Sequence, residues 1–210
     1  MYFSFSTASE GFIWCKTARR GNHFAAFFIS GIPIELFVAI RWNDINFEKK
    51  TISISKRVLD YKSTEVIALS VRERYEAKQP DILFEYLDNE LKIQAEELGI
   101  SPQTLKTSAK PVIWKQKLGE QSSVDNFNHY LNHFVKDTLK ARYKRGDIAY
   151  SSGVFAFKAG CDLLSIISIV NVYAAMNMFK NPEKFDCFES RNTTNINDYF
   201  DNLAKDIIKS

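Results

Sequence analysis

The feature that most constrains the fold is a change in hydrophobic period along the first third of the chain. From Asn22 to Ile40 apolar residues recur at helical spacing, with an interruption at Ser30-Gly31-Ile32-Pro33. Because proline lacks an amide donor but fits the first turn of a helix, this segment predicts a helix, a tight turn and a second helix from about Pro33. Thr51 to Ser55 then alternates polar and apolar residues, which indicates a half-buried strand.

The remaining segments predict one more strand and several helices. Residues 65–69 form the second strand, and the polar run at 56–64 between the two strands indicates a β-hairpin. Helices are expected at 79–98, ending at Gly99, and from Ser122-Ser123-Val124-Asp125 toward Lys140. Further helices are expected at 150–158, 162–170 and 195–209. The predicted class is therefore α+β, mostly helical with a small antiparallel sheet.

Composition is that of an ordinary globular protein. The 210 residues are 45% apolar and 25% charged, and no repeat or linker divides them. We expect an N-terminal extension (1–20), one main domain (21–194) and a C-terminal helix (195–210). The three widely spaced cysteines, Cys15, Cys161 and Cys187, fit neither a disulfide framework nor a zinc site. No apolar run approaches a membrane span and no signal peptide is evident, so a cytoplasmic protein without membrane contact is expected.

Two segments carry a more specific signal. Gly31 to Ile54 contains Arg41-Trp42-Asn43-Asp44-Ile45, followed by Thr51-Ile52-Ser53-Ile54, and this stretch resembles the first conserved box of the tyrosine recombinases (phage integrases) without a gap. Asp147 to Leu163 is similar to that family's second box, again without a gap. The resemblance covers roughly residues 20–180 and implies the fold of the family's catalytic domain.

The positions that cut DNA in that family are changed here. The resemblance puts the two phosphate-clamping arginines at Pro33 and Ala149, the histidine after the second arginine at Tyr150, and the later histidine at Val172. The nucleophilic tyrosine falls at Phe179, which lacks the hydroxyl, or at Asn181. Only the hairpin lysine, a general acid in the family, has a counterpart, in Lys62. The expectation is a recombinase-like protein that is not an enzyme.

An alternative keeps strand transfer through displaced residues. Tyr173 or Tyr199 would then replace the nucleophile and Arg145 the second arginine. Loss of the first arginine argues against this, because removing such a group lowers the rate by orders of magnitude.

Basic residues on the hairpin and after the helix from Ser122 are candidates for contact with DNA phosphates. These candidates are Lys56, Arg57, Lys62, Lys140, Arg142, Lys144 and Arg145, with Lys136 in the same run. The competing interpretation is ordinary solvated surface charge, and a net charge of +3 permits DNA binding without requiring it. His129 and His133 have a possible metal spacing but no third ligand, so we expect no metal and no cofactor.

The expected partners are DNA, an active recombinase, or both, in a phage or other mobile element. The amphipathic helix at 195–209 would pack within the chain or onto a second copy. The family's N-terminal core-binding domain has no counterpart in this sequence, so half of the family's DNA clamp is expected to be absent. A protein-interaction module without DNA binding, or a functionless remnant, remains an alternative.

Overall fold

The computed structural model describes residues 21–115 and 119–137. It begins with helix α2 (Gly21–Ser30), a tight turn in which Gly31 has a φ of 62°, and the short helix α3 (Ile34–Phe37). Pro33 precedes α3, and its carbonyl accepts the backbone N–H groups of Leu36 and Phe37, both at 2.9 Å. The predicted helix, turn and helix are therefore confirmed, although the second helix is only one turn long.

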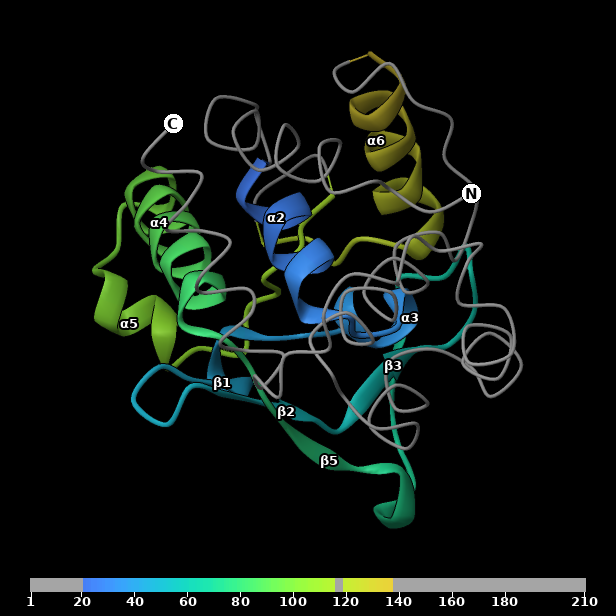
Figure 1. Cartoon of the computed structure of the whole chain (residues 1–210), viewed down its shortest axis with the longest axis horizontal. Coiled ribbons are helices and arrows are strands. Elements are labelled where there is room, and N and C mark those ends of the chain that lie inside the picture. Colours follow the sequence, from blue (N-terminus) through green and yellow to red (C-terminus); the bar gives the residue numbers. More distant parts are fainter. Residues whose placement is uncertain (1–20, 116–118, 138–210) are drawn as a thin grey trace, which may run out of the picture.

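The strands form two antiparallel sheets (Figure 1). After the 3-10 turn η1 (Trp42–Asp44), the strands β1 (Ile45–Asn46), β2 (Thr51–Ile54) and β5 (Tyr75–Lys78) form a three-stranded sheet with β2 in the centre. Strands β3 (Lys56–Val58) and β4 (Val66–Ala68) form a separate two-stranded hairpin. The 3-10 turn η2 (Val71–Glu73) lies between β4 and β5.

The predicted pairing of the strands is wrong. Residues 51–55 were expected to pair with 65–69, but β2 pairs with β1 and β5, while β4 pairs with β3. The chain changes partner at Ser55, whose carbonyl accepts the backbone N–H of Leu69 at 2.9 Å. The prediction of a loop directly after Ser55 is also wrong, since residues 56–58 form β3. In this strand Val58 is buried while its neighbour Arg57 faces out.

Three further helices follow the sheets. Helix α4 (Asp81–Leu98) ends at Gly99, whose φ of 65° is the left-handed conformation that glycine adopts without strain, as predicted. Helix α5 (Pro102–Lys106) is short. Helix α6 (Val124–Asp137) starts where predicted, with the Ser123 hydroxyl accepting the backbone N–H of Asn126 at 3.1 Å.

The part of the core where α2, α3 and α6 meet is rich in aromatic rings. Phe27 contacts Phe37 and Phe127 at ring-centroid distances of 5.0 and 5.4 Å, and Phe24 contacts Phe134 at 4.9 Å. Aromatic pairs of this kind contribute about 0.5–1.5 kcal/mol each beyond the burial of their surface. Phe24 and Phe27 are therefore core residues.

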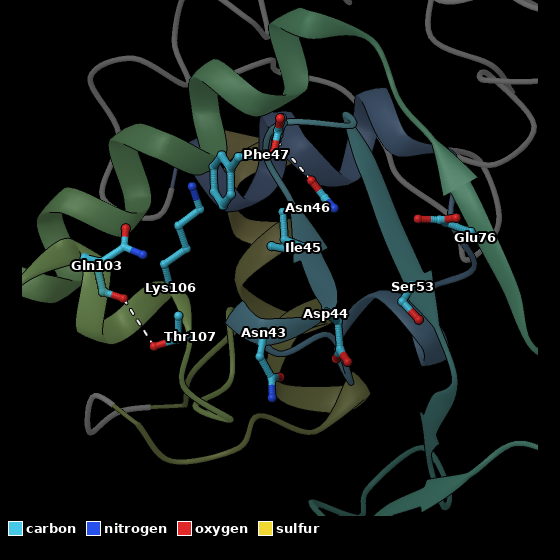
Figure 2. Close-up of a pocket in the computed structure, with 11 residues that line it drawn as sticks. Asn43, Asp44, Ile45, Asn46, Phe47, Ser53, Glu76, Gln103, Lys106 and Thr107 are labelled. Carbon is cyan, nitrogen blue, oxygen red and sulfur yellow. Dashed lines mark hydrogen bonds between the residues drawn. The ribbon is translucent and has the colours of Figure 1, made fainter.

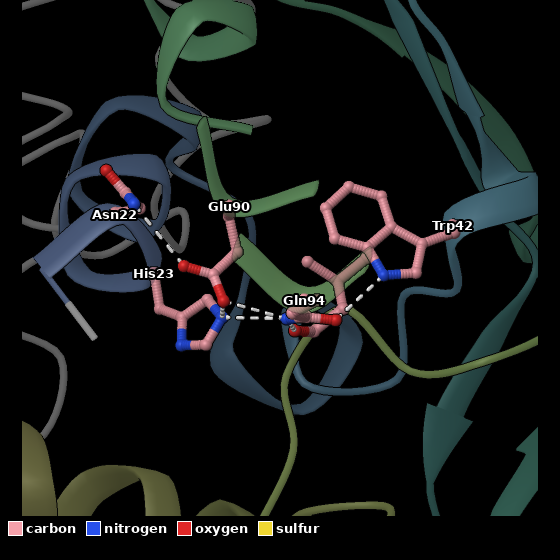
Figure 3. A network of polar contacts seen from close by, with 6 residues as sticks. Asn22, His23, Trp42, Glu90 and Gln94 are labelled. Carbon is pink, nitrogen blue, oxygen red and sulfur yellow. Dashed lines mark hydrogen bonds and ion pairs between the residues drawn. The ribbon is translucent and has the colours of Figure 1, made fainter. Parts of the chain in front are cut away.

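A buried polar network fixes α4 against α2 (Figure 3). Glu90 on α4 lies 2.9 Å from Nε2 of His23 on α2, and both side chains are almost fully buried. Gln94, one turn further along α4, donates to Glu90 and to the carbonyl of Val112, both at 2.9 Å. The Trp42 indole donates to Gln94 Oε1 at 3.0 Å. The network thus joins four segments that are distant in the sequence: α2, η1, α4 and the chain at Val112.

Several predictions fall on residues outside the described ranges. These are the N-terminal extension (1–20), the helices at 150–158, 162–170 and 195–209, and the domain boundary at 194. Among the described residues, no helix is both long and apolar enough to cross a membrane.

Candidate nucleic-acid interface

The β3–β4 hairpin carries three of the basic residues predicted to contact DNA. Its side chains alternate, with Val58 facing the core, Lys56 half-buried on the same side, and Arg57 exposed on the opposite side beside its cross-strand partner Ile67. The Arg57 side chain has no ion pair or hydrogen bond to the described part of the chain. Arg57 is therefore placed to contact a phosphate.

Lys56 is different, because its ammonium group already has a partner. Its Nζ lies 2.6 and 2.9 Å from the two carboxylate oxygens of Asp44, which is 12% exposed. Asp44 also accepts the backbone N–H of Arg41 at 2.9 Å, so the carboxylate joins η1 to the start of the hairpin. The predicted DNA contact by Lys56 would have to compete with this ion pair, which makes Lys56 primarily a structural residue.

The hairpin tip has a fixed conformation. One carboxylate oxygen of Asp60 accepts the backbone N–H groups of Lys62 and Ser63, at 2.9 and 2.8 Å. Such local bonds from an aspartate preorganise a turn. Lys62 is exposed at this tip, and its side chain makes no ion pair or hydrogen bond with any residue in the described ranges.

Tyr61 anchors the tip to α6. The Tyr61 hydroxyl accepts a hydrogen bond from Asn128 Nδ2 at 2.7 Å, and its carbonyl accepts the backbone N–H of Asp125 at 2.9 Å. The first turn of α6 therefore holds the residue next to Lys62. This contact joins segments more than sixty residues apart in the sequence.

Pro33 occupies the position that the resemblance assigns to the first clamping arginine. Its ring is exposed immediately before α3, and its only polar atom, the carbonyl oxygen, accepts hydrogen bonds from Leu36 and Phe37. This side chain has no hydrogen-bond donor with which to hold a phosphate.

The other predicted site positions lie outside the described residues. They are Ala149, Tyr150, Val172 and Phe179, the candidate nucleophiles Tyr173 and Tyr199, and the basic residues Lys140, Arg142, Lys144 and Arg145.

His129 and His133 lie exposed on α6, with ring centroids 4.6 Å apart. Within the described ranges, no group of three or more histidine, cysteine or acidic side chains could hold a metal ion.

Sequence reasoning missed an exposed turn between the two sheets. The turn contains Arg72 and Arg74, both exposed, and lies around η2. A signal was present, because Ser70 and Glu73 have the spacing of a capping box.

An open depression of about 560 Å³ lies between β1 and α5 (Figure 2). Its acidic lining residues, Asp44, Glu48 and Glu76, outnumber the single basic one, Lys106. Lys106 Nζ lies 4.4 Å from the centroid of the Phe47 ring. The charge of this depression does not suit a phosphate, and the cations of the hairpin lie outside it.

No protein-family model and no curated protein sequence matches the chain. Several solved structures of the Tn1549 transposon integrase are similar to it in fold. One, in complex with circular intermediate DNA, is 12% identical with a TM-score of 0.66, and the match covers 84% of this chain and 61% of that one. A tyrosine-to-phenylalanine variant, in complex with transposon right end DNA, is 12% identical with a TM-score of 0.65, covering 100% and 65%.

The chain thus spans less than two thirds of the length of these integrases. At this level of identity the likeness establishes the fold and nothing further. The helices, the two small antiparallel sheets and the structural matches agree with the α+β class expected from the sequence. The chain therefore has the fold of a tyrosine-recombinase, integrase-like catalytic domain.

Proposed function

We propose that this protein binds DNA through the β3–β4 hairpin without cutting it, alone or beside an active recombinase of a mobile element. The observation that carries the proposal is the pair of exposed cations on the hairpin, Arg57 and Lys62, neither of which forms an ion pair or a hydrogen bond through its side chain in the described ranges. Phosphate contacts require cations at fixed positions on a surface rather than a deep pocket.

The rigidity of the hairpin supports the same function. Asp60 fixes the turn and Tyr61 attaches it to α6, so the position of Lys62 is set before a ligand arrives. A preorganised contact loses less conformational entropy on binding than a mobile one. The similar solved structures are integrases in complex with DNA, which makes DNA the first ligand to test.

The proposed absence of cutting rests on the exchanged residues. The resemblance puts the family's first phosphate-clamping arginine at Pro33 and its nucleophilic tyrosine at Phe179 or Asn181. A phenylalanine has no hydroxyl with which to form a covalent link to phosphorus.

Binding is tested by fluorescence anisotropy of a labelled DNA duplex with the full chain, between roughly 50 and 200 mM salt. The logarithm of the affinity should fall linearly with the logarithm of the salt concentration, and Arg57→Ala/Lys62→Ala should lower the slope by about 2. The matched control is Lys92→Ala, an exposed lysine on α4 that pairs with Asp88. No binding at low salt, or equal losses in the double variant and the control, would refute the proposed interface.

Cutting is tested separately with nicked DNA substrates that trap a covalent intermediate. No protein–DNA adduct should form. An adduct that disappears in Tyr199→Phe or Tyr173→Phe would establish a displaced nucleophile and overturn the non-cutting part of the proposal.

A further inference from the structure

The segment from Val71 to Tyr75, here called the projecting turn, is held in a fixed shape. The Glu73 carboxylate accepts hydrogen bonds from the backbone N–H and the hydroxyl of Ser70, at 3.1 and 2.6 Å. Arg74 Nε donates to the carbonyl of Leu69 at 3.0 Å. Figure 1 shows this segment at the bottom of the view, where the chain enters β5, away from the helices.

The projecting turn displays apolar surface that the core does not use. Val71 is 79% exposed and Tyr75 is 46% exposed, and no other large apolar side chain in the described ranges is as exposed as Val71. A single exposed apolar residue is ordinary on a protein surface. A rigid turn that holds a valine beside two arginines is more specific, because it pairs an apolar tip with positive charge.

The charges of the turn favour an anionic partner. The Arg72 side chain is exposed and makes no ion pair or hydrogen bond within the described ranges. The one carboxylate of the turn, that of Glu73, is directed onto Ser70. The turn follows directly on β4, where Ile67 is the cross-strand partner of Arg57. The turn and the hairpin are therefore neighbouring parts of the structure.

We propose that the projecting turn contacts a groove of double-stranded DNA, with Val71 entering the groove and Arg72 bound to a phosphate at its edge. Apolar side chains contact thymine methyl groups in the major groove or wedge between base steps in the minor groove, while arginines fix the register on the backbone. This inference rests on the proposed function, since it extends the hairpin interface to a second element.

The two roles give different signatures in the anisotropy assay with the full chain. Val71→Ser should weaken DNA binding by roughly fivefold to tenfold with an unchanged salt slope, because it removes apolar contact and no charge. Arg72→Gln should lower the slope by about 1. The matched controls are Ile93→Ser and Lys92→Gln on α4, since Ile93 is 44% exposed and Lys92 is a surface lysine.

The outcomes separate this inference from the proposed function. If Arg57→Ala/Lys62→Ala weakens binding but Val71→Ser and Arg72→Gln behave like the controls, the projecting turn is not a DNA contact and the hairpin interface stands. If the full chain binds no duplex at low salt, both ideas fail. Sedimentation tests whether a second copy of the chain, rather than DNA, binds the turn. If Val71→Ser abolishes self-association and leaves the DNA affinity unchanged, the turn is a contact between copies of the chain and the inference is wrong. Thermal unfolding of each variant should match the wild type, since these side chains are exposed.

Discussion

Replacing Glu90 by glutamine removes one charge from the buried network with almost no change in side-chain size. Glu90 is 4% exposed, and its carboxylate lies 2.9 Å from His23 Nε2. Burial alone raises the pKa of Glu90, but the electrostatic interaction with His23 and the hydrogen bonds from His23, Gln94 and Asn22 outweigh it and lower the pKa from 4.5 to about 2. At about 1.4 kcal/mol per pKa unit, the carboxylate contributes about 3 kcal/mol to folding. Breaking a buried pair costs a similar amount, about 3–5 kcal/mol.

The pH dependence follows from the direction of this shift. Because the pKa is lower in the folded state, the stabilisation is present above about pH 4.5 and is lost as the pH falls toward 2. Urea unfolding, followed by the fluorescence of the buried Trp42 and Trp114, measures the free energy of unfolding. Glu90→Gln should be less stable than wild type by about 3 kcal/mol at neutral pH, with a smaller difference at about pH 3.

The matched control for this measurement is Glu97→Gln, an exposed glutamate on the same helix. Its effect on the free energy of unfolding should stay within about 0.5 kcal/mol. If Glu90→Gln is as stable as this control, or if its loss of stability does not become smaller in acid, the charge of the buried carboxylate does not stabilise the fold.

Two further substitutions test local features of the fold. Tyr61→Phe removes the hydroxyl that accepts a hydrogen bond from Asn128 Nδ2. It should lower the free energy of unfolding by about 1–3 kcal/mol and speed proteolysis of the hairpin tip. An unchanged cleavage rate at the tip would show that Tyr61 does not anchor it. Gly99→Ala should lower stability by about 1–2 kcal/mol through backbone strain alone, because φ is 65° and nothing lies within 4 Å of the added Cβ. Thermal unfolding measures both variants, and Gly99→Asn should be the milder change. Equal losses of stability in the two variants would point to a cause other than φ.

Local signals in the sequence predicted three helix boundaries. Pro33, Gly99 and Ser123 each restrict the backbone or supply a cap, and the structure has helix boundaries beside all three. These effects depend on a few neighbouring residues, so they are visible without knowing the rest of the fold.

The candidate interface was less predictable from the sequence. Arg57 and Lys62 were expected on a hairpin and are exposed there, but Lys56 looked equivalent and proves to be paired with Asp44. The projecting turn was not expected at all, because exposure of Val71 depends on where the sheet ends rather than on residue type.

By itself the sequence determined the helices α2, α4 and α6, the presence of antiparallel strands and the resemblance to integrases, because hydrophobic period, caps and motif spacing are properties of short segments. Only the tertiary structure decided that the strand changes partner at Ser55, that Asp44 takes up Lys56, and that Tyr61 docks on α6. Each of these depends on groups brought together by the fold. A hydrogen bond or an ion pair requires atoms within about 3–4 Å, and that proximity is a result of packing rather than of local sequence.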